Sequence, residues 1–278
     1  MQSKFLVELF MKKGKLLGSG ITAEVYEWGP DKILKLYFEE YSTIEQLGNE
    51  LNIGHIVYKS GIHTPAVHDN VEVDGRKGII YERIYGKSVF ERLTEEPWNL
   101  FSYIKKMAEL QQSIHNFSAI GLPTQMDSFT CAINASSGIL GQRVKKILEY
   151  TESLPNGSSI CHGDLYFGNI IISGENFVPI DWYGAYLGNP LSDVARTGIV
   201  FCSPAVPRGF PDECAIFYYY QKWISYWIYI DEYIKLAKVR NEDIDTWQLP
   251  AAAARLKDNI PGEKNWLMDI IDKRLRQI

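Results

Sequence analysis

The sequence predicts an α+β protein of two lobes, with one helix packed on the antiparallel β-sheet of the N-terminal lobe and a mainly helical C-terminal lobe. Short strand and turn signals dominate as far as about residue 85, whereas helical periodicity dominates after Gly86. No internal repeat or low-complexity linker separates the two halves, so Tyr85-Gly86 is interpreted as a hinge. We therefore expect lobes at 1–85 and 86–278.

The N-terminal strands are predicted in pairs. Ile21–Trp28 and Lys32–Phe38 flank a Gly-Pro-Asp turn, and Val67–Val73 and Lys77–Ile84 flank Asp74-Gly75. Asp and Gly tolerate positive φ, which a tight hairpin turn requires.

One helix interrupts these strands. It begins at Ser42 or Thr43, where Ser42 and Glu45 have capping-box spacing, and ends before Ser60-Gly61. We expect this helix to pack against the sheet.

The C-terminal lobe carries most of the predicted helices. Apolar periodicity places them at Pro97–Phe117, Ile139–Tyr150, Asp212–Lys238, Asp243–Lys257 and Glu263–Arg276. A short strand pair, Ile170–Ser173 and Phe177–Ile180, interrupts the helices. Acidic or amide side chains stand just outside both ends of this pair.

Composition excludes several classes of protein. With 278 residues, 46% of them hydrophobic, the chain can bury a substantial core. The 29 basic and 34 acidic residues include no basic run, so no nucleic-acid partner is expected. The four cysteines form no CxxC pair, and we interpret them as reduced, small, buried apolar residues.

Two apolar stretches bear on localisation. Phe5–Met11 contains Glu8 and lacks a following cleavage site, so we interpret it as an early strand and not as a signal peptide. Phe217–Ile234 is rich in aromatic residues but contains too many polar ones for a membrane span. We expect a cytoplasmic protein with no membrane partner, while the sequence leaves its oligomeric state open.

A glycine-rich segment lies between the first two predicted strands. In Gly18-Ser19-Gly20-Ile21-Thr22-Ala23-Glu24-Val25, small residues would let the backbone approach a triphosphate closely. A glycine pair in a hairpin is more often only a turn. A dinucleotide-binding motif is excluded because a strand, and not a helix, follows the glycines.

Lys35 lies in the next predicted strand, on the same face as Ile33. Glu50 can supply its partner, because on the intervening helix it shares a stripe with Leu47 and Gly54. The alternative is that Lys35 extends to solvent and Glu50 pairs locally.

The segment 161–182 supplies three further polar groups. A kinase catalytic loop uses an Asp at the substrate hydroxyl, an Asn five residues later for magnesium, and an Asp beyond a hairpin that bridges metal and phosphates. Asp164, Asn169 and Asp181 have that spacing. Turn formation would explain the last two separately but not the ordered set.

His162-Gly163-Asp164 with Asn169, followed by Ile180-Asp181-Trp182, resembles the signature of the aminoglycoside phosphotransferase and choline kinase superfamily, whose fold is protein-kinase-like. The resemblance runs in chain order from about Leu16 to Leu256. It implies a kinase that transfers the γ-phosphate of ATP, or alternatively GTP, to a small-molecule hydroxyl.

The same resemblance implies roles for individual residues. Asp164 would be the catalytic base, Asn169 and Asp181 would hold Mg2+, Lys35 would contact the α- and β-phosphates and Glu50 would position Lys35. The remaining nucleotide-binding residues implied by the resemblance are Gly18, Ser19 and Gly20 in the glycine loop and Glu82 near the adenine hinge. His162 and Asp193 are expected to be structural, with Asp193 bracing the catalytic loop.

Two alternatives to a small-molecule kinase stay open. Protein phosphorylation is disfavoured because the chain has no H-R-D, D-F-G or A-P-E motif, and Trp182-Tyr183 stands where protein kinases have Phe-Gly. Ala23 replaces their third loop glycine, a change without steric consequence. A nucleotide-binding regulatory module without turnover is the second alternative, since fold alone does not fix function.

The sequence does not choose between an aminoglycoside, choline, a sugar or another small alcohol as the acceptor. A choline-like cation would suit aromatic faces, which the chain offers at Tyr218, Tyr219, Trp223, Tyr226, Trp227 and Tyr229. Aromatic residues at helical spacing more often pack a core. An aminoglycoside would suit an acidic lid, for which the candidates are Asp212, Glu213, Asp231, Glu232, Glu242, Asp243 and Asp245. Nearby basic residues weaken that second argument.

Overall fold

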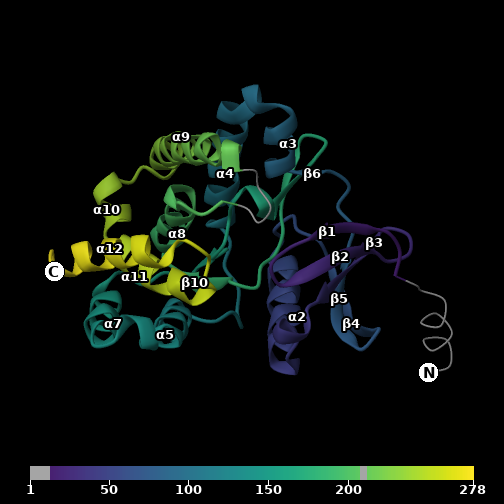
Figure 1. The fold of residues 1–278 in the computed structure, drawn as a ribbon, viewed down its shortest axis with the longest axis horizontal. Coiled ribbons are helices and arrows are strands. Elements are labelled where there is room, and N and C mark those ends of the chain that lie inside the picture. Colours follow the sequence, from purple (N-terminus) through teal and green to yellow (C-terminus); the bar gives the residue numbers. More distant parts are fainter. Residues whose placement is uncertain (1–12, 207–211) are drawn as a thin grey trace. The chain divides into compact units, whose positions relative to one another are not determined.

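The computed structural model describes residues 13–206 and 212–278, so the early strand predicted at Phe5–Met11 lies outside the described residues. Its contacts divide the chain into two compact units. Of the described residues, the first comprises 13–87 and Ile171–Tyr183, and the second comprises Ser88–Ile170, 184–206 and 212–278. Figure 1 labels most of the elements of both units. The first unit is discontinuous in sequence because the 171–183 segment packs with N-terminal residues.

A five-stranded antiparallel sheet forms the first unit. Its strands are β1 (Leu16–Ser19), β2 (Ala23–Glu27), β3 (Lys32–Tyr37), β4 (Val67–Val73) and β5 (Arg76–Glu82). They are arranged in the order β1-β2-β3-β5-β4. Asp74 and Gly75 join β4 to β5 with φ values of 53° and 76°, which confirms the predicted tight turn.

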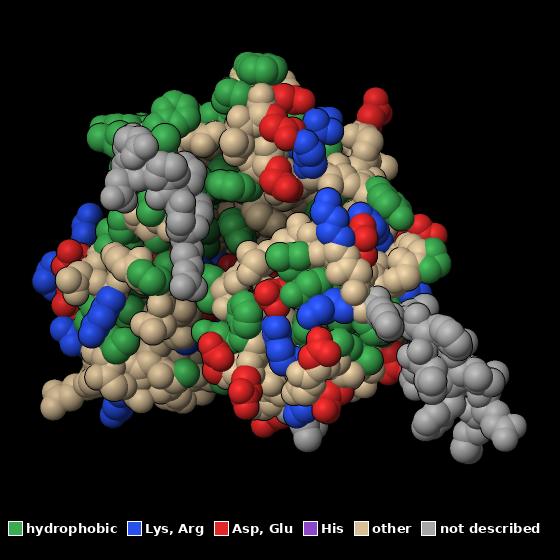
Figure 2. Space-filling view, turned by 45° about the vertical axis from the view of Figure 1, so that its right-hand side comes forward, with side chains coloured by type: hydrophobic (Ala, Val, Ile, Leu, Met, Phe, Trp, Pro, Cys, Tyr) green, Lys and Arg blue, Asp and Glu red, His purple; other side chains and the backbone are tan. Residues whose placement is uncertain are grey.

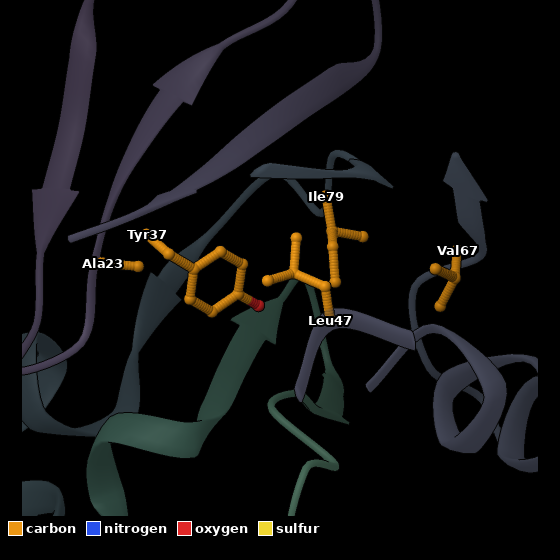
Figure 3. Packing of buried hydrophobic residues seen from close by; sticks show 5 residues of the cluster. All are labelled: Ala23, Tyr37, Leu47, Val67 and Ile79. Atoms are coloured by element: carbon orange, nitrogen blue, oxygen red, sulfur yellow. The ribbon is translucent and has the colours of Figure 1, made fainter. Parts of the chain in front are cut away.

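The two faces of the sheet have separate apolar clusters. Along β3, Leu34 and Leu36 pack with Trp28 on one face, whereas Tyr37 points to the other. There it joins Ala23, Leu47, Val67 and Ile79 in the cluster of Figure 3. Leu47 comes from helix α2 (Ile44–Lys59), so this second face is the one that α2 covers.

Helix α2 is fixed at its start by a cap and along its length by close packing. Thr43 Oγ1 accepts the Gln46 N–H at 3.2 Å, and the Gln46 side chain accepts the Thr43 N–H. The predicted pairing of Ser42 with Glu45 is therefore wrong by one residue, because the chain enters the helix one position later. Further along, a Cβ on Gly54 would lie 2.4 Å from Val67 Cγ2, so glycine lets α2 approach β4.

The predicted strand pair at 170–180 is present as β8 (Ile170–Ser173) and β9 (Asn176–Pro179). With β6 (Lys87–Ser88) it forms a three-stranded sheet in the order β6-β8-β9. A Cβ on Gly86 would lie 2.2 Å from the Ile172 carbonyl oxygen. Close backbone approach therefore explains the glycine at position 86.

Helices make up most of the second unit, together with a strand pair, β7 (Ser159–Cys161) and β10 (Tyr186–Gly188). Its α-helices are α3 (Val89–Glu95), α4 (Leu100–Ile114), α5 (Gln125–Ala135), α6 (Ser137–Leu140), α7 (Arg143–Ser153), α8 (Pro190–Cys202), α9 (Asp212–Ala237), α10 (Asn241–Asp245), α11 (Gln248–Arg255) and α12 (Lys264–Leu275). Short 3-10 turns lie at Pro97–Asn99, Phe167–Asn169 and Leu256–Asp258 in this unit, and at Glu39–Tyr41 in the first unit. The helix predicted at 243–257 is in fact two helices, and α3, α5 and α8 were not predicted.

Surface and core depart from the sequence expectation at the cysteines. Cys161 is buried and Cys202 half-buried, but Cys131 and Cys214 are exposed, so the expectation that all four are buried is wrong.

Acidic and basic side chains are interspersed on the face drawn in Figure 2. Within residues 13–206 and 212–278, none of the helices combines the length and the apolar character needed to cross a membrane.

Candidate active site

The glycine segment forms the turn between β1 and β2. Gly18 pairs with Val25 and Ser19 with Glu24, and the Gly20 N–H donates to the Ala23 carbonyl at 2.8 Å. A Cβ on Gly18 would meet no heavy atom within 4 Å, and one on Gly20 only the Ala23 carbonyl oxygen at 3.7 Å. Packing therefore does not require either glycine. A ligand that approaches the backbone closely would explain both.

Lys35 stands between two carboxylates. Its Nζ donates to Glu50 Oε1 at 2.8 Å and to Asp181 Oδ1 at 3.0 Å. Glu50 is only 6% exposed and also accepts the Tyr81 hydroxyl proton at 2.8 Å. The first unit thus assembles three residues whose positions in the chain span 35 to 181, and the local-pairing alternative for Lys35 and Glu50 is wrong.

Electrostatics keep Lys35 charged. Burial opposes the charge, but the carboxylates of Asp181 and Glu50 outweigh it and raise the lysine pKa above its ordinary value. A buried ammonium with this geometry presents a fixed positive charge to a third, anionic partner such as a phosphate oxygen.

Asp181 adopts a left-handed backbone conformation with φ of 64°. Asp accepts this region more readily than most non-glycine residues, at a small energetic cost. Trp182, which follows, donates from Nε1 to Thr64 Oγ1 at 2.8 Å, and Thr64 donates in turn to the Pro179 carbonyl at 2.9 Å. These bonds fix the chain on both sides of Asp181 and so fix its carboxylate beside Lys35.

In the second unit, Asp164 and Asn169 lie together. Asn169 Nδ2 donates to the Asp164 carbonyl at 2.9 Å and to Asp164 Oδ2 at 3.2 Å. Because the amide nitrogen is committed to Asp164, the amide oxygen Oδ1 is the atom that can serve a cation. Oxygen donors of this type, with a carboxylate, suit Mg2+.

A buried network holds the backbone before Asp164. Asp193, fully buried, accepts the N–H groups of His162 at 2.9 Å and Gly163 at 2.7 Å. Gln111 Nε2 donates to the same carboxylate at 2.9 Å, and His115 Nε2 lies 3.1 Å from it. Burial alone would raise the pKa of Asp193, but His115 and these bonds lower it to about 2.

Two arginines that the sequence analysis did not single out approach Asp164. Arg196 Nη2 and Arg255 Nη1 lie 3.8 Å and 3.7 Å from Asp164 Oδ1. Burial raises the Asp164 pKa, and the two guanidinium groups oppose that rise. Both arginines also pair with Asp258. No local sequence signal marks this set, because α8, α11 and the turn after α11 bring it together.

Glu82 has a structural task at the end of β5. Its Oε2 accepts the Ala66 N–H at 3.0 Å, and its own N–H donates to the Ala66 carbonyl at 2.8 Å. The carboxylate therefore secures the start of β4, and its predicted nucleotide role stays a prediction.

The aromatic residues of α9 are divided between core and surface. Tyr218 and Tyr229 are buried and Tyr226 is half-buried, whereas Tyr219, Trp223 and Trp227 are exposed. Figure 2 shows apolar side chains along the upper part of the face drawn there. The core interpretation therefore holds for only part of this helix.

Most of the described acidic-lid candidates are already paired with cations. Asp231 pairs with Lys235, and Glu232 pairs with Lys105. Likewise Asp243 pairs with Arg240 and Asp245 with Arg274. The side chains of Asp212 and Glu213 lie outside the described residues. These ion pairs weaken the case for an acidic lid selective for polycations.

Comparison with known protein families identifies the family of this chain. The model of the phosphotransferase enzyme family matches residues 13–223, well over half of the chain. The chain belongs to the phosphotransferase enzyme family. The matched range contains the glycine turn, Lys35, Asp164 and Asp181. No curated protein sequence matches the chain.

Solved structures show the same fold for this phosphotransferase-family chain. A thermostable mutant of aminoglycoside phosphotransferase APH(4)-Ia in its apo form has a TM-score of 0.67 at 17% identity and covers 99% of this chain and 98% of its own. Aminoglycoside-3'-phosphotransferase of type VIII has a TM-score of 0.58 at 15% identity, over 91% and 98% of the two chains. The streptomycin–ATP complex of APH(2")-IIa has a TM-score of 0.58 at 12% identity, over 97% and 96%. The predicted kinase-like α+β fold is confirmed.

Proposed function

We propose that this phosphotransferase transfers the γ-phosphate of Mg-ATP to a hydroxyl group of a small molecule. The observation that carries the proposal is the buried Lys35, which donates to both Glu50 and Asp181. A lysine fixed between two carboxylates is what a kinase needs to hold phosphate oxygens beside a metal-binding Asp. The glycine turn, open above Gly18 and Gly20, supports the same assignment.

The first unit would bind the nucleotide. Gly18, Ser19 and Gly20 would approach the phosphates through their backbone, and Lys35 would neutralise phosphate oxygens while Glu50 holds it in place. Asp181 would offer a carboxylate oxygen and Asn169 an amide oxygen to Mg2+, and both are of the donor type that this metal prefers. When bound, the metal would supply neutralisation of the phosphate charge. The division into an N-terminal nucleotide lobe and a C-terminal substrate lobe belongs to the same proposal.

Asp164 would act on the acceptor. Its carboxylate would orient the hydroxyl and accept its proton as the hydroxyl oxygen forms a bond to the γ-phosphorus. The bond from that phosphorus to the bridging oxygen breaks, and ADP leaves with the bonding electron pair. The side chain is 37% exposed, so an acceptor can reach it. Asn169 Nδ2 donates to Asp164 Oδ2 at 3.2 Å and so helps to hold the carboxylate in place.

The solved structures name nucleotides and acceptors for the proteins they contain. One is a ternary complex of APH(4)-Ia with AMP-PNP and hygromycin B, another contains streptomycin and ATP, and a third contains GDP. They support testing both ATP and GTP here. They do not select an acceptor for this chain, because all are below 20% identical to it.

Incubating the purified protein with magnesium and labelled ATP or GTP across a panel of alcohols, sugars, choline analogues and aminoglycosides would test the proposal. We expect transfer to at least one of these small molecules. A protein substrate is included, because transfer to protein alone would favour a protein kinase. Thermal stabilisation by nucleotide with no transfer to any acceptor would favour a silent regulatory module and contradict the proposal.

A further inference from the structure

The set of charges around Asp164 has an internal order. Arg196 Nη2 donates to Asp258 Oδ2, and Arg255 Nη1 donates to the same oxygen at 3.3 Å. The same two nitrogens lie 3.8 Å and 3.7 Å from Asp164 Oδ1. Asp258 therefore takes the hydrogen bonds, and Asp164 receives attraction at a distance beyond hydrogen bonding.

Arg255 is anchored from behind. Its Nε and Nη2 donate to the two carboxylate oxygens of Glu263 at 2.7 Å and 3.0 Å, a bidentate pair with a side chain only 2% exposed. This fork leaves Nη1 as the nitrogen directed at Asp258 and Asp164. The guanidinium plane is thus set by Glu263 and not by Asp164.

Arg196 is held more loosely. Among the residues that the structure describes, the buried Nε of Arg196 has no hydrogen-bond partner. The position of the Arg196 guanidinium therefore depends largely on its hydrogen bond to Asp258. Arg255 and Asp258 lie beyond residue 223, where the family match ends. The arrangement around Asp164 therefore depends on a part of the chain that the family model does not reach.

We propose that Arg196 and Arg255 are positioning residues for Asp164, and that Asp258 holds their guanidinium groups back from its carboxylate so that an acceptor hydroxyl can reach it. The proposal rests on the proposed function of Asp164 as the base. Two cations at 3.7–3.8 Å orient the carboxylate without occupying its lone pairs. At hydrogen-bond distance the same cations would compete with the acceptor.

Three variants separate this arrangement from a merely structural one. In Asp258→Asn the neutral amide no longer competes for Arg196, which lacks the Glu263 anchor that fixes Arg255, so Arg196 should close on Asp164 and lower kcat by about 100-fold. Arg196→Met removes one orienting cation and should lower kcat by about tenfold. The double variant should return to the level of Arg196→Met, because the arginine that would block Asp164 is gone. The KM for ATP should stay within about twofold in all three.

The contradicting result is equally specific. If the double variant loses the product of the two single effects, about 1000-fold, the residues act independently and the proposal is wrong. Full activity in Asp258→Asn also overturns it. Asp272→Asn and Arg143→Met are the matched controls, since Arg143 and Asp272 form a comparable bidentate pair away from Asp164 and should leave kcat unchanged.

A structural measurement keeps the inference independent of turnover. If the wild type transfers phosphate to no acceptor, the proposed function fails, but a crystal structure of Asp258→Asn still decides the positioning claim. We expect an arginine nitrogen within hydrogen-bond distance of Asp164, and arginines that stay in place or turn away would contradict it. If Asp258→Asn does not fold, Arg196→Lys should retain most of the kcat that Arg196→Met loses, and equal values would overturn the proposal.

Discussion

The two charge clusters of this protein have opposite compositions. In the first unit one ammonium group, Lys35, donates to two carboxylates at 2.8 Å and 3.0 Å. In the second, one carboxylate, Asp164, faces two guanidinium groups at 3.7 Å and 3.8 Å. In the proposed mechanism, the tight cluster would hold a nucleotide's phosphates still. The looser cluster would leave the Asp164 carboxylate able to exchange partners with an acceptor.

The largest effect on stability should come from the tight cluster. Lys35→Met removes the cation shared by Glu50 and Asp181 and should lower the free energy of unfolding by about 3 to 5 kcal/mol. Arg196→Met should cost less, because Arg255 still pairs with Asp258. Urea denaturation of both variants measures the difference, and an equal loss would show that the two clusters are equally tight.

Asp193 tests whether the loop before Asp164 depends on a buried charge. Asp193→Asn replaces one of the two carboxylate oxygens that accept the His162 and Gly163 N–H groups with an NH2 group, which cannot accept a hydrogen bond. The substitution should lower the free energy of unfolding by about 3 kcal/mol at pH 7. The native pKa of about 2 lies below the ordinary value of 3.8, so the wild type keeps this stabilisation above pH 3.8 and loses it as the pH falls toward 2. The difference in the free energy of unfolding between wild type and variant should therefore narrow by about 2 kcal/mol between pH 3.8 and pH 2.

Denaturant unfolding of wild type and Asp193→Asn at pH 6, 4 and 2.5 would follow this gap. Comparing two proteins at each pH removes the contribution of their other carboxylates. A gap that is constant with pH would mean that the ionised Asp193 does not stabilise the loop.

The smallest effect should come from the helix that carries Glu50. Thr43→Ala removes the cap of α2 and should lower stability by about 1 kcal/mol. Glu45→Gln, at the position first expected to complete the cap, should change it little because Gln46 fills that role. Thermal melts of the two variants would distinguish the registers, and a larger loss in Glu45→Gln would contradict the observed cap.

The sequence could predict the tight cluster because its members stand in motifs with fixed spacing. Strand and helix periodicity predict the positions of Lys35 and Glu50. Asp181 comes shortly after a hairpin whose two strands have four residues each. Some missed elements also carried signals: α3 begins at the capping box Ser88 and Glu91, and α5 at Thr124 and Asp127. These boxes lie outside strong apolar periodicity, the signal that predicts the other helices.

The arginine set around Asp164 could not be predicted in this way. Arg196, Arg255 and Asp258 come from separate elements, and their meeting depends on how α8 and α11 pack. Nothing local distinguishes Arg255 from the solvated arginines of other helices. Likewise the exposure of Cys131 and Cys214 depends on which helix faces are covered, a tertiary property.

The division of labour between nucleotide binding and transfer is tested most directly by measuring turnover and Mg-ATP affinity together in two variants. We expect Asp164→Ala to lose turnover by at least about 100-fold while it binds ATP like the wild type. Asp181→Ala should lose turnover and productive binding of the metal–nucleotide complex as well. Full activity in both variants, or an equal loss of ATP affinity in both, would contradict the account.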